Sequence, residues 1–310
     1  MIMRRFYLVA VTIFLMLSVT AVPAWAGEKI ALLISLDDGP FKEMVGAFTE
    51  YLGKQGAQPS YELFSLEGNP SKAGAAIQKI KVSGFTLIYT LGSLATEAAV
   101  KEISDIPIVA GLIMRTDAFR KTPNATGVGL EFPIETQFTW MQKMLPQART
   151  IGVLYSAQEN KKRVESAARA AQKLGFKLEP QEVSSAQDIP DALQRLSKKA
   201  EVVWGLTDTV VLSPQSSKPI LLFSLNNNIP FIGPSSMWVK AGALYALDYD
   251  YRDLGVQCAE MALKVMRGAP IAEVPPAAPR SVKYSLNTIT ARQMKIALDE
   301  SVVKGALHVY

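Results

Sequence analysis

The chain contains two stretches in which apolar and polar residues follow one another in the same order. Residues 30–64 begin with the apolar run IALLISL, pass through the polar residues DDGP into an amphipathic stretch, and end in a second apolar run. Residues 150–183 repeat this order with TIGVLYS, AQEN, KKRVESAARAAQKLG and FKLEPQEV. Later, FTLIYTLGSLATEAA before IPIVAG corresponds to EVVWGLTDTVVLSPQ before IPFIGP. Two similar halves predict two lobes that face each other across a cleft, where a small molecule can be enclosed.

Helices and short strands alternate along both stretches. Apolar residues at helical spacing predict helices over residues 41–52 and 164–174, and a glycine follows each of them. Strands are predicted where short runs are continuously apolar, at residues 30–34, 87–89, 108–112, 151–155, 202–204 and 220–223. Continuously apolar strands between helices indicate parallel sheets that are covered on both faces. The predicted fold class is therefore α/β, with two doubly wound parallel-sheet lobes around a central cleft.

The first 26 residues have the features of a signal peptide. Arg4 and Arg5 precede a mostly apolar segment at residues 6–22, and the AWA of residues 24–26 fits a cleavage site with small residues. An uncleaved membrane anchor is the alternative, but the apolar segment is short for that role. No cysteine lies near the cleavage site, so a lipid-attached form is not indicated. We expect cleavage to leave a soluble periplasmic chain, whose formal net charge falls from +5 to +3 because the segment carries two arginines and no acids.

The composition is typical of a globular protein, with 49% hydrophobic and 20% charged residues. The positive charge is spread along the chain. The densest basic cluster, the KKR of residues 161–163, is interpreted as a solvated helix face, and no stripe suited to nucleic acid is present. The single cysteine, Cys258, lies on the apolar side of a predicted helix, which predicts a buried side chain without a disulfide.

The sequence lacks the common motifs for catalysis, metal binding and cofactor binding. The only histidine, His308, is close to the C-terminus, which disfavours Ser-His-Asp and Cys-His catalysis. The patterns HExxH, CxxC, GxxxxGK[ST] and GxGxxG do not occur. We therefore expect a protein that binds a small molecule without catalysis, and that has no metal and no cofactor. An exported enzyme that uses a pair of cleft carboxylates, Asp37 and Asp208, stays open as an alternative.

Candidate ligand contacts follow the predicted strands, because ligands of parallel α/β sheets bind beyond the carboxyl ends of the strands. In the first half, Gly92 and Ser93 form a turn at a helix start, whose free N–H groups suit an anion such as a carboxylate. In the second half, Asp208 takes the corresponding place and suits a cation such as an α-ammonium. A ligand with both charges, an amino acid, would bridge the lobes. The other candidate contacts are Asp37, Tyr155, Ser156, Thr207, Ser235, Ser236 and Tyr249.

Each candidate contact also has a purely structural interpretation. Asp208 could cap a helix, and Ser93 could cap one while it also binds a ligand. Asp37 could belong only to the turn DDGP. The serines of residues 235–236 could lie in an ordinary surface loop, and Tyr249 could lie in a hinge between the lobes.

Several motifs, taken in order, carry a family resemblance that runs over nearly the whole chain after the signal peptide. They are TLGSLATEAA before IPIVAG, TGVGLEFPIETQF, LPQARTIGVLYS, WGLTDTVVLS, NNNIPFIGPSS, AGALYALDYDYRDLG and YSLNTITARQMKIALDESVVKGA. The chain resembles substrate-binding proteins of ABC transporters with the type I periplasmic binding fold, and more narrowly the family that includes tryptophan- and tyrosine-binding lipoproteins. It departs from that family at Gly92-Ser93, where the family often has Gly-Thr, and at Tyr155-Ser156-Ala157, where the family often has Tyr-Asn-Pro.

The resemblance implies a lobe organisation and a partner. The N-terminal lobe would comprise residues 27–147 and 251–276, and the C-terminal lobe residues 148–250 and 277–310. The crossings between the lobes would fall near residues 146–150, 248–252 and 275–280. The resemblance implies that a monomeric binding protein delivers a small molecule to an ABC permease, with an amino acid, and among these an aromatic one, as the candidate ligand. A sensory module that reports the ligand to a receptor kinase is the alternative within the same fold.

Overall fold

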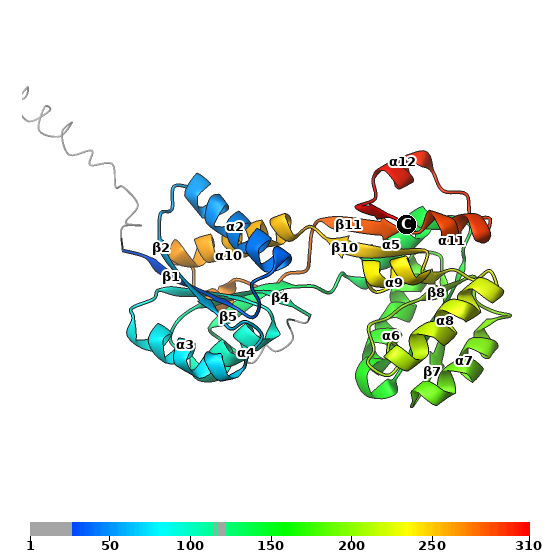
Figure 1. The fold of residues 1–310 in the computed structure, drawn as a ribbon, viewed down its shortest axis with the longest axis horizontal. Coiled ribbons are helices and arrows are strands. Elements are labelled where there is room, and N and C mark those ends of the chain that lie inside the picture. Colours follow the sequence, from blue (N-terminus) through cyan, green and yellow to red (C-terminus); the bar gives the residue numbers. More distant parts are fainter. Residues whose placement is uncertain (1–26, 115, 117–118, 120–121) are drawn as a thin grey trace, which may run out of the picture.

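The computed structural model describes residues 27–114, 116, 119 and 122–310, which form two α/β lobes joined by extended segments (Figure 1). The predicted signal peptide, residues 1–26, lies outside the described residues. Within the described part of the chain, no helix is both long enough and apolar enough to cross a membrane.

The N-terminal lobe contains a five-stranded parallel sheet in the order β2-β1-β3-β4-β5. Side chains of β1 alternate between its two faces, with Leu32 in a core under helices α2 and α10 and Leu33 in a core under helices α3 and α4. This burial on both sides explains the continuously apolar strand. Cys258 of α10 is buried in the first of these cores, as predicted. The elements are β1 (Lys29–Ile34), α2 (Gly39–Lys54), β2 (Ser60–Ser65), α3 (Ser71–Val82), β3 (Leu87–Leu91), α4 (Ser93–Glu102), β4 (Ile108–Ile113), β5 (Ala125–Gly129) and α10 (Tyr251–Met266).

The C-terminal lobe contains a seven-stranded sheet in the order β12-β11-β10-β9-β8-β6-β7, parallel except for the antiparallel pair β10 and β11. Trp204 of β8 belongs to the core on one face with helices α5 and α6, and Val203 belongs to the core on the other face with α7 and α8. Its elements are α5 (Ile134–Met144), β6 (Thr150–Tyr155), α6 (Ala157–Lys173), β7 (Lys177–Glu182), α7 (Ile189–Leu196), β8 (Val202–Trp204), α8 (Pro214–Asn226), β9 (Phe231–Ile232), α9 (Ser236–Ala241), β10 (Tyr245–Tyr249), β11 (Val282–Leu286), α11 (Thr288–Gln293), α12 (Glu300–Lys304) and β12 (His308–Val309), with short 3-10 turns η2 (Ala186–Asp188) here and η3 (Ile271–Glu273) after α10. Two doubly wound lobes confirm the predicted fold class.

The chain leaves the N-terminal lobe earlier than the sequence predicted. Helix α5 places Phe138, Met141 and Met144 in the core of the C-terminal lobe, so the first crossing segment is residues 130–133 and not residues 146–150. The prediction put the boundary at the start of the repeated pattern and assigned α5 to the wrong lobe. The second crossing lies at the junction of β10 and α10. The third crossing begins after Ala277, because this residue is still bound to the edge strand β5 of the N-terminal lobe. Its N–H donates to the carbonyl oxygen of Gly127, and its carbonyl oxygen accepts from the N–H of Gly129.

The predicted strand at residues 220–223 is a helix. These residues lie inside α8, where Ile220 packs in a core while Leu222 and Leu225 remain exposed. A short apolar run does not distinguish a strand from a buried helix face. The strand that does follow β8 is β9, which has only two residues.

Candidate ligand-binding cleft

A cavity of about 400 Å³ lies where the crossing segments meet the C-terminal lobe. This volume is within the usual range for small-molecule sites. The N-terminal lobe and the first crossing contribute Met114, which follows β4, together with Leu130, Glu131 and Phe132. The C-terminal lobe contributes the ends of β8, β9 and β10 and the start of α6, including Gln158, Asn160, Arg163, Trp204, Thr207, Gly233, Tyr245 and Tyr249.

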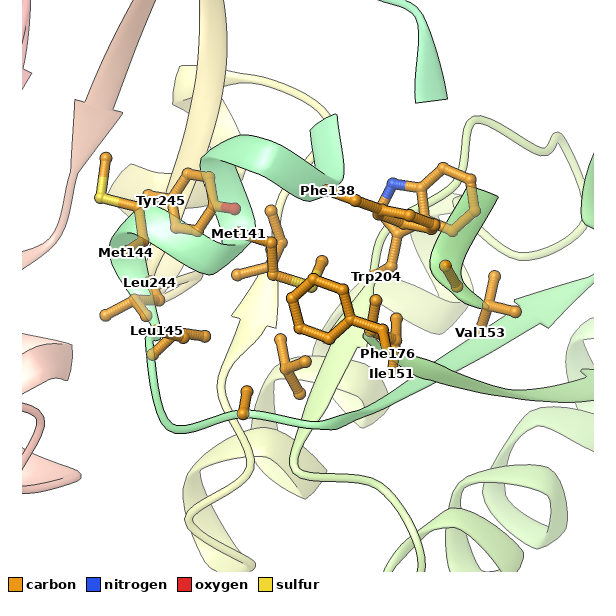
Figure 2. Close-up of a cluster of buried hydrophobic side chains, with 14 of the residues drawn as sticks. Phe138, Met141, Met144, Leu145, Ile151, Val153, Phe176, Trp204, Leu244 and Tyr245 are labelled. Atoms are coloured by element: carbon orange, nitrogen blue, oxygen red, sulfur yellow. The ribbon is translucent and has the colours of Figure 1, made fainter. Parts of the chain in front are cut away.

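Four aromatic side chains line the cavity, namely Phe132, Trp204, Tyr245 and Tyr249. The Trp204 indole packs edge-to-face on Phe138, with 5.1 Å between ring centroids, in the core that Figure 2 shows. Phe132 and Tyr249 come from two different crossing segments and stack with their rings 5.1 Å apart and inclined by 8°. Burial raises the pKa of Tyr249 to about 12, so its hydroxyl stays neutral at physiological pH. Such walls suit a flat apolar ligand group.

One side-chain amide connects the indole to the first crossing segment. The Nε1 of Trp204 donates a hydrogen bond to Oε1 of Gln137 at 2.9 Å. The Nε2 of the same glutamine donates to the carbonyl oxygen of Phe132 at 2.8 Å. The indole, the amide and the crossing backbone are thus held in one hydrogen-bonded chain.

Charges of both signs line the cavity. A guanidinium nitrogen of Arg163, on α6, lies 2.5 Å from a carboxylate oxygen of Glu131, on the first crossing segment. Their side chains are 17% and 32% exposed, respectively. The carboxylate of Glu159, also on the wall, accepts hydrogen bonds from the N–H and the hydroxyl of Thr209. The interpretation of residues 161–163 as a solvated face is therefore wrong for Arg163, although its two neighbours are exposed.

Asp208 has a structural role in the C-terminal lobe, and its contact with a ligand stays a prediction. Its Oδ2 accepts from the N–H of Ser156 at 2.7 Å, the hydroxyl of Ser156 at 2.9 Å and the side-chain amide of Asn160 at 2.8 Å. Its Oδ1 accepts from the N–H groups of Val210 and Val211, at 3.0 and 3.1 Å. Burial opposes ionisation, but the hydrogen bonds, led by that from the Ser156 backbone, outweigh it and hold the pKa of Asp208 below its usual value. No lone pair is left for a ligand ammonium, and Ser156 serves the same network.

The Gly92-Ser93 turn lies at the carboxyl end of β3, outside the cavity wall. Gly92 precedes α4 with φ 86°, and a Cβ there would lie 2.5 Å from Ser35 Oγ, so only glycine fits. Ser35 Oγ accepts from the N–H of Ala95 at 3.0 Å. Among the described residues, none accepts a hydrogen bond from the N–H groups of Ser93 and Leu94. These donors are available to an anion, and their contact with a ligand stays a prediction.

The other predicted contacts divide into two groups. Thr207 and Tyr249 line the cavity. Tyr155 does not, because its hydroxyl lies 3.4 Å from Glu182 on the edge strand β7. Asp37 is exposed and pairs with Lys42 at 3.6 Å, and it shares no cavity with Asp208. The serines of residues 235–236 begin α9, next to Pro234, which lines the cavity while they do not. The described residues contain no cluster of side chains suited to a metal ion.

Sequence reasoning missed Glu131, Gln137 and Arg163 as cavity residues. Two of them lie within TGVGLEFPIETQF, and the third lies in the basic cluster that follows the first strand of the second half. Only the position of Arg163 near a helix start, beyond a strand end, could have indicated it.

The fold and the cavity define a two-lobed α/β ligand-binding protein. Residues 29–310 match a family model described as "ABC transporter substrate binding protein", and the chain therefore belongs to that family.

Individual relatives agree with this assignment. A tyrosine-binding protein of Clostridioides difficile is 28% identical over 201 residues, which cover 61% of this chain and 57% of that protein. The chain thus matches less than two thirds of that relative. The ligand-free, open structure of a substrate binding protein with adhesive properties from Clostridium difficile has a TM-score of 0.71 at 22% identity, with coverage of 91% of this chain and 99% of the other. A domain from Streptococcus pneumonia in complex with L-Trp has a TM-score of 0.60 at 23% identity, with coverage of 92% and 100%. At these identities, the two structures show the fold alone.

Proposed function

We propose that this substrate-binding protein binds an amino acid with a large apolar side chain and delivers it to an ABC permease. The cavity is the observation that carries the proposal, because its aromatic wall, with Trp204 and Tyr249, stands beside the charged pair of Glu131 and Arg163. Such a wall suits an aromatic side chain, and the pair suits a zwitterion. The names of a tyrosine-binding relative and of a neighbour in complex with L-Trp support the same ligand class.

Closure of the lobes would couple binding to delivery. A ligand held in the C-terminal lobe favours a closed form to the extent that it binds that form more tightly. The Gly92-Ser93 turn is the proposed contact from the N-terminal lobe, because its free N–H groups suit the ligand's carboxylate. The closed form is then the state that docks on the permease.

The proposed place of action is the periplasm, after removal of the signal peptide at residues 1–26. Mass spectrometry of the protein from a periplasmic extract measures this directly. A mature N-terminus at residue 27 is expected, and a full-length chain retained in the cytoplasm contradicts the proposal. Light scattering of the same sample tests the expectation of a monomer.

Ligand binding is tested by calorimetric titration and thermal shift with the twenty amino acids, small carboxylic acids and purines. A ligand at a hundredfold excess over its dissociation constant should stabilise the protein by about 2.7 kcal/mol. Aromatic amino acids are expected to be among the ligands. Binding of purines or acids but no amino acid contradicts the proposed ligand class. A gene deletion that leaves uptake of the bound amino acid unchanged contradicts delivery to a permease.

A further inference from the structure

The ion pair between Glu131 and Arg163 joins two parts of the molecule that meet at the cavity. Glu131 follows β5 in the first crossing segment, and Arg163 lies in the second turn of α6. Both side chains line the cavity, and both are more than half buried. Among the described residues, the other acid on the wall is Glu159, which accepts two hydrogen bonds from Thr209.

A pair of this kind contributes little to the stability of the fold. In a partly buried ion pair, the cost of removing both charges from water offsets much of their attraction. The contact therefore costs little to open when another charged group can take its place. The pair lines the same cavity as the aromatic side chains of Trp204 and Tyr249, so one ligand can contact both charged and apolar groups there.

We infer that the ligand's ammonium and carboxylate replace the two halves of this pair. In this exchange, Glu131 binds the α-ammonium that the sequence assigned to Asp208. Arg163 binds the α-carboxylate, to which the Gly92-Ser93 turn would add its N–H groups in the closed form. The inference rests on the proposed function, since it names the recognition residues of the same cavity. Opening of the pair also frees the first crossing segment from α6, which couples ligand entry to movement of the lobes.

The exchange defines which ligands bind well. A zwitterion replaces both halves of the pair, whereas a ligand with one charge replaces only one half. The charge-assisted contact between Glu131 and Arg163 is then lost, and only one new contact compensates for it. We expect wild-type protein to bind L-tryptophan at least about tenfold more tightly than L-tryptophanamide or indole-3-propionate. The first analogue lacks the carboxylate and the second lacks the ammonium.

Paired variants and analogues test the assignment of each charge. Titration calorimetry on the full mature chain would compare Glu131→Gln and Arg163→Gln with L-tryptophan, L-tryptophanamide and indole-3-propionate. The matched controls are Glu135→Gln and Arg169→Gln, which change exposed residues on α5 and α6 outside the cavity. Both test variants should bind L-tryptophan at least about tenfold more weakly than wild type. Glu131→Gln should bind indole-3-propionate at least as tightly as wild type, and Arg163→Gln should do the same for L-tryptophanamide, because in each variant the ligand's charge no longer has to displace the other half of the pair.

The crossed pattern separates recognition from a general structural effect, which would weaken every ligand alike. L-tyrosine and L-phenylalanine serve as second probes in the same series. If wild type binds any of these three amino acids while the test variants behave as their controls, this inference is overturned and the proposed ligand class stands. The inference is also overturned if wild type binds tryptophan and both analogues with equal affinity. If wild type binds none of the three, both the aromatic ligand class and this inference fall.

Discussion

Replacing Asp208 by alanine tests the structural role of the buried carboxylate in the C-terminal lobe. The side chain is 2% exposed and accepts five hydrogen bonds, from Ser156, Asn160, Val210 and Val211. Alanine leaves those donors without their acceptor. An unsatisfied buried donor costs about 1–3 kcal/mol, and water that enters the vacated space restores partners to some of them. We therefore expect Asp208→Ala to lower the free energy of unfolding by about 3 kcal/mol.

Urea unfolding followed by circular dichroism measures this change, with the midpoint and the slope compared between proteins. Asp37→Ala is the control, because that carboxylate is exposed and pairs only with Lys42. Asp37→Ala should change the free energy of unfolding by no more than about 0.5 kcal/mol. The folded Asp208→Ala protein should still bind its ligand, because the carboxylate does not line the cavity. If the free energy of unfolding of Asp208→Ala is within about 0.5 kcal/mol of the wild-type value but the variant no longer binds its ligand, this reasoning is refuted and Asp208 is again the expected ammonium partner.

Three further predictions concern stability. Gly92→Ala should lower the free energy of unfolding by about 2 kcal/mol in thermal denaturation, because φ is 86° and the new Cβ would press on Ser35; an unchanged melting temperature contradicts this. Trp204→Phe should lower the free energy of unfolding by about 1 kcal/mol in thermal denaturation, because it removes the hydrogen bond to Gln137. The pKa of Asp208 is lower in the folded protein than in the unfolded chain, where it is about 3.9. The ionised carboxylate therefore stabilises the fold fully at pH values above the unfolded pKa, and this contribution is lost as the pH falls through the lower folded pKa. The advantage of wild type over Asp208→Asn in urea unfolding should therefore shrink below about pH 4, and a constant difference would contradict the assignment.

The sequence predicted the architecture well because the relevant pattern is local. A strand with both faces covered needs consecutive apolar residues, and residues 30–34 and 151–155 show this directly. The repeated order of such strands and helices indicated two lobes without any knowledge of their contacts. The run at residues 220–223 misled the prediction, because four apolar residues suit a buried helix face equally well.

The candidate site was harder to predict because it depends on contacts between distant segments. Asp208 follows a strand end, as a ligand contact should, but its five donors come from the start of α6 and from the residues that follow Asp208 itself. Glu131 and Arg163 are 32 positions apart and become a pair only when the first crossing segment meets α6. Helix α5 was assigned to the wrong lobe for a related reason, because its amphipathic pattern shows that it packs but not on which sheet.

The amide of Gln137 has a mechanical consequence. It accepts from the indole of Trp204 and donates to the backbone at Phe132, so one planar group contacts both the wall of the cavity and the first crossing segment between the lobes. A ligand that displaced the indole would strain both hydrogen bonds of this amide. Under the proposed function, these two bonds would transmit the displacement from the cavity wall to the segment that joins the lobes.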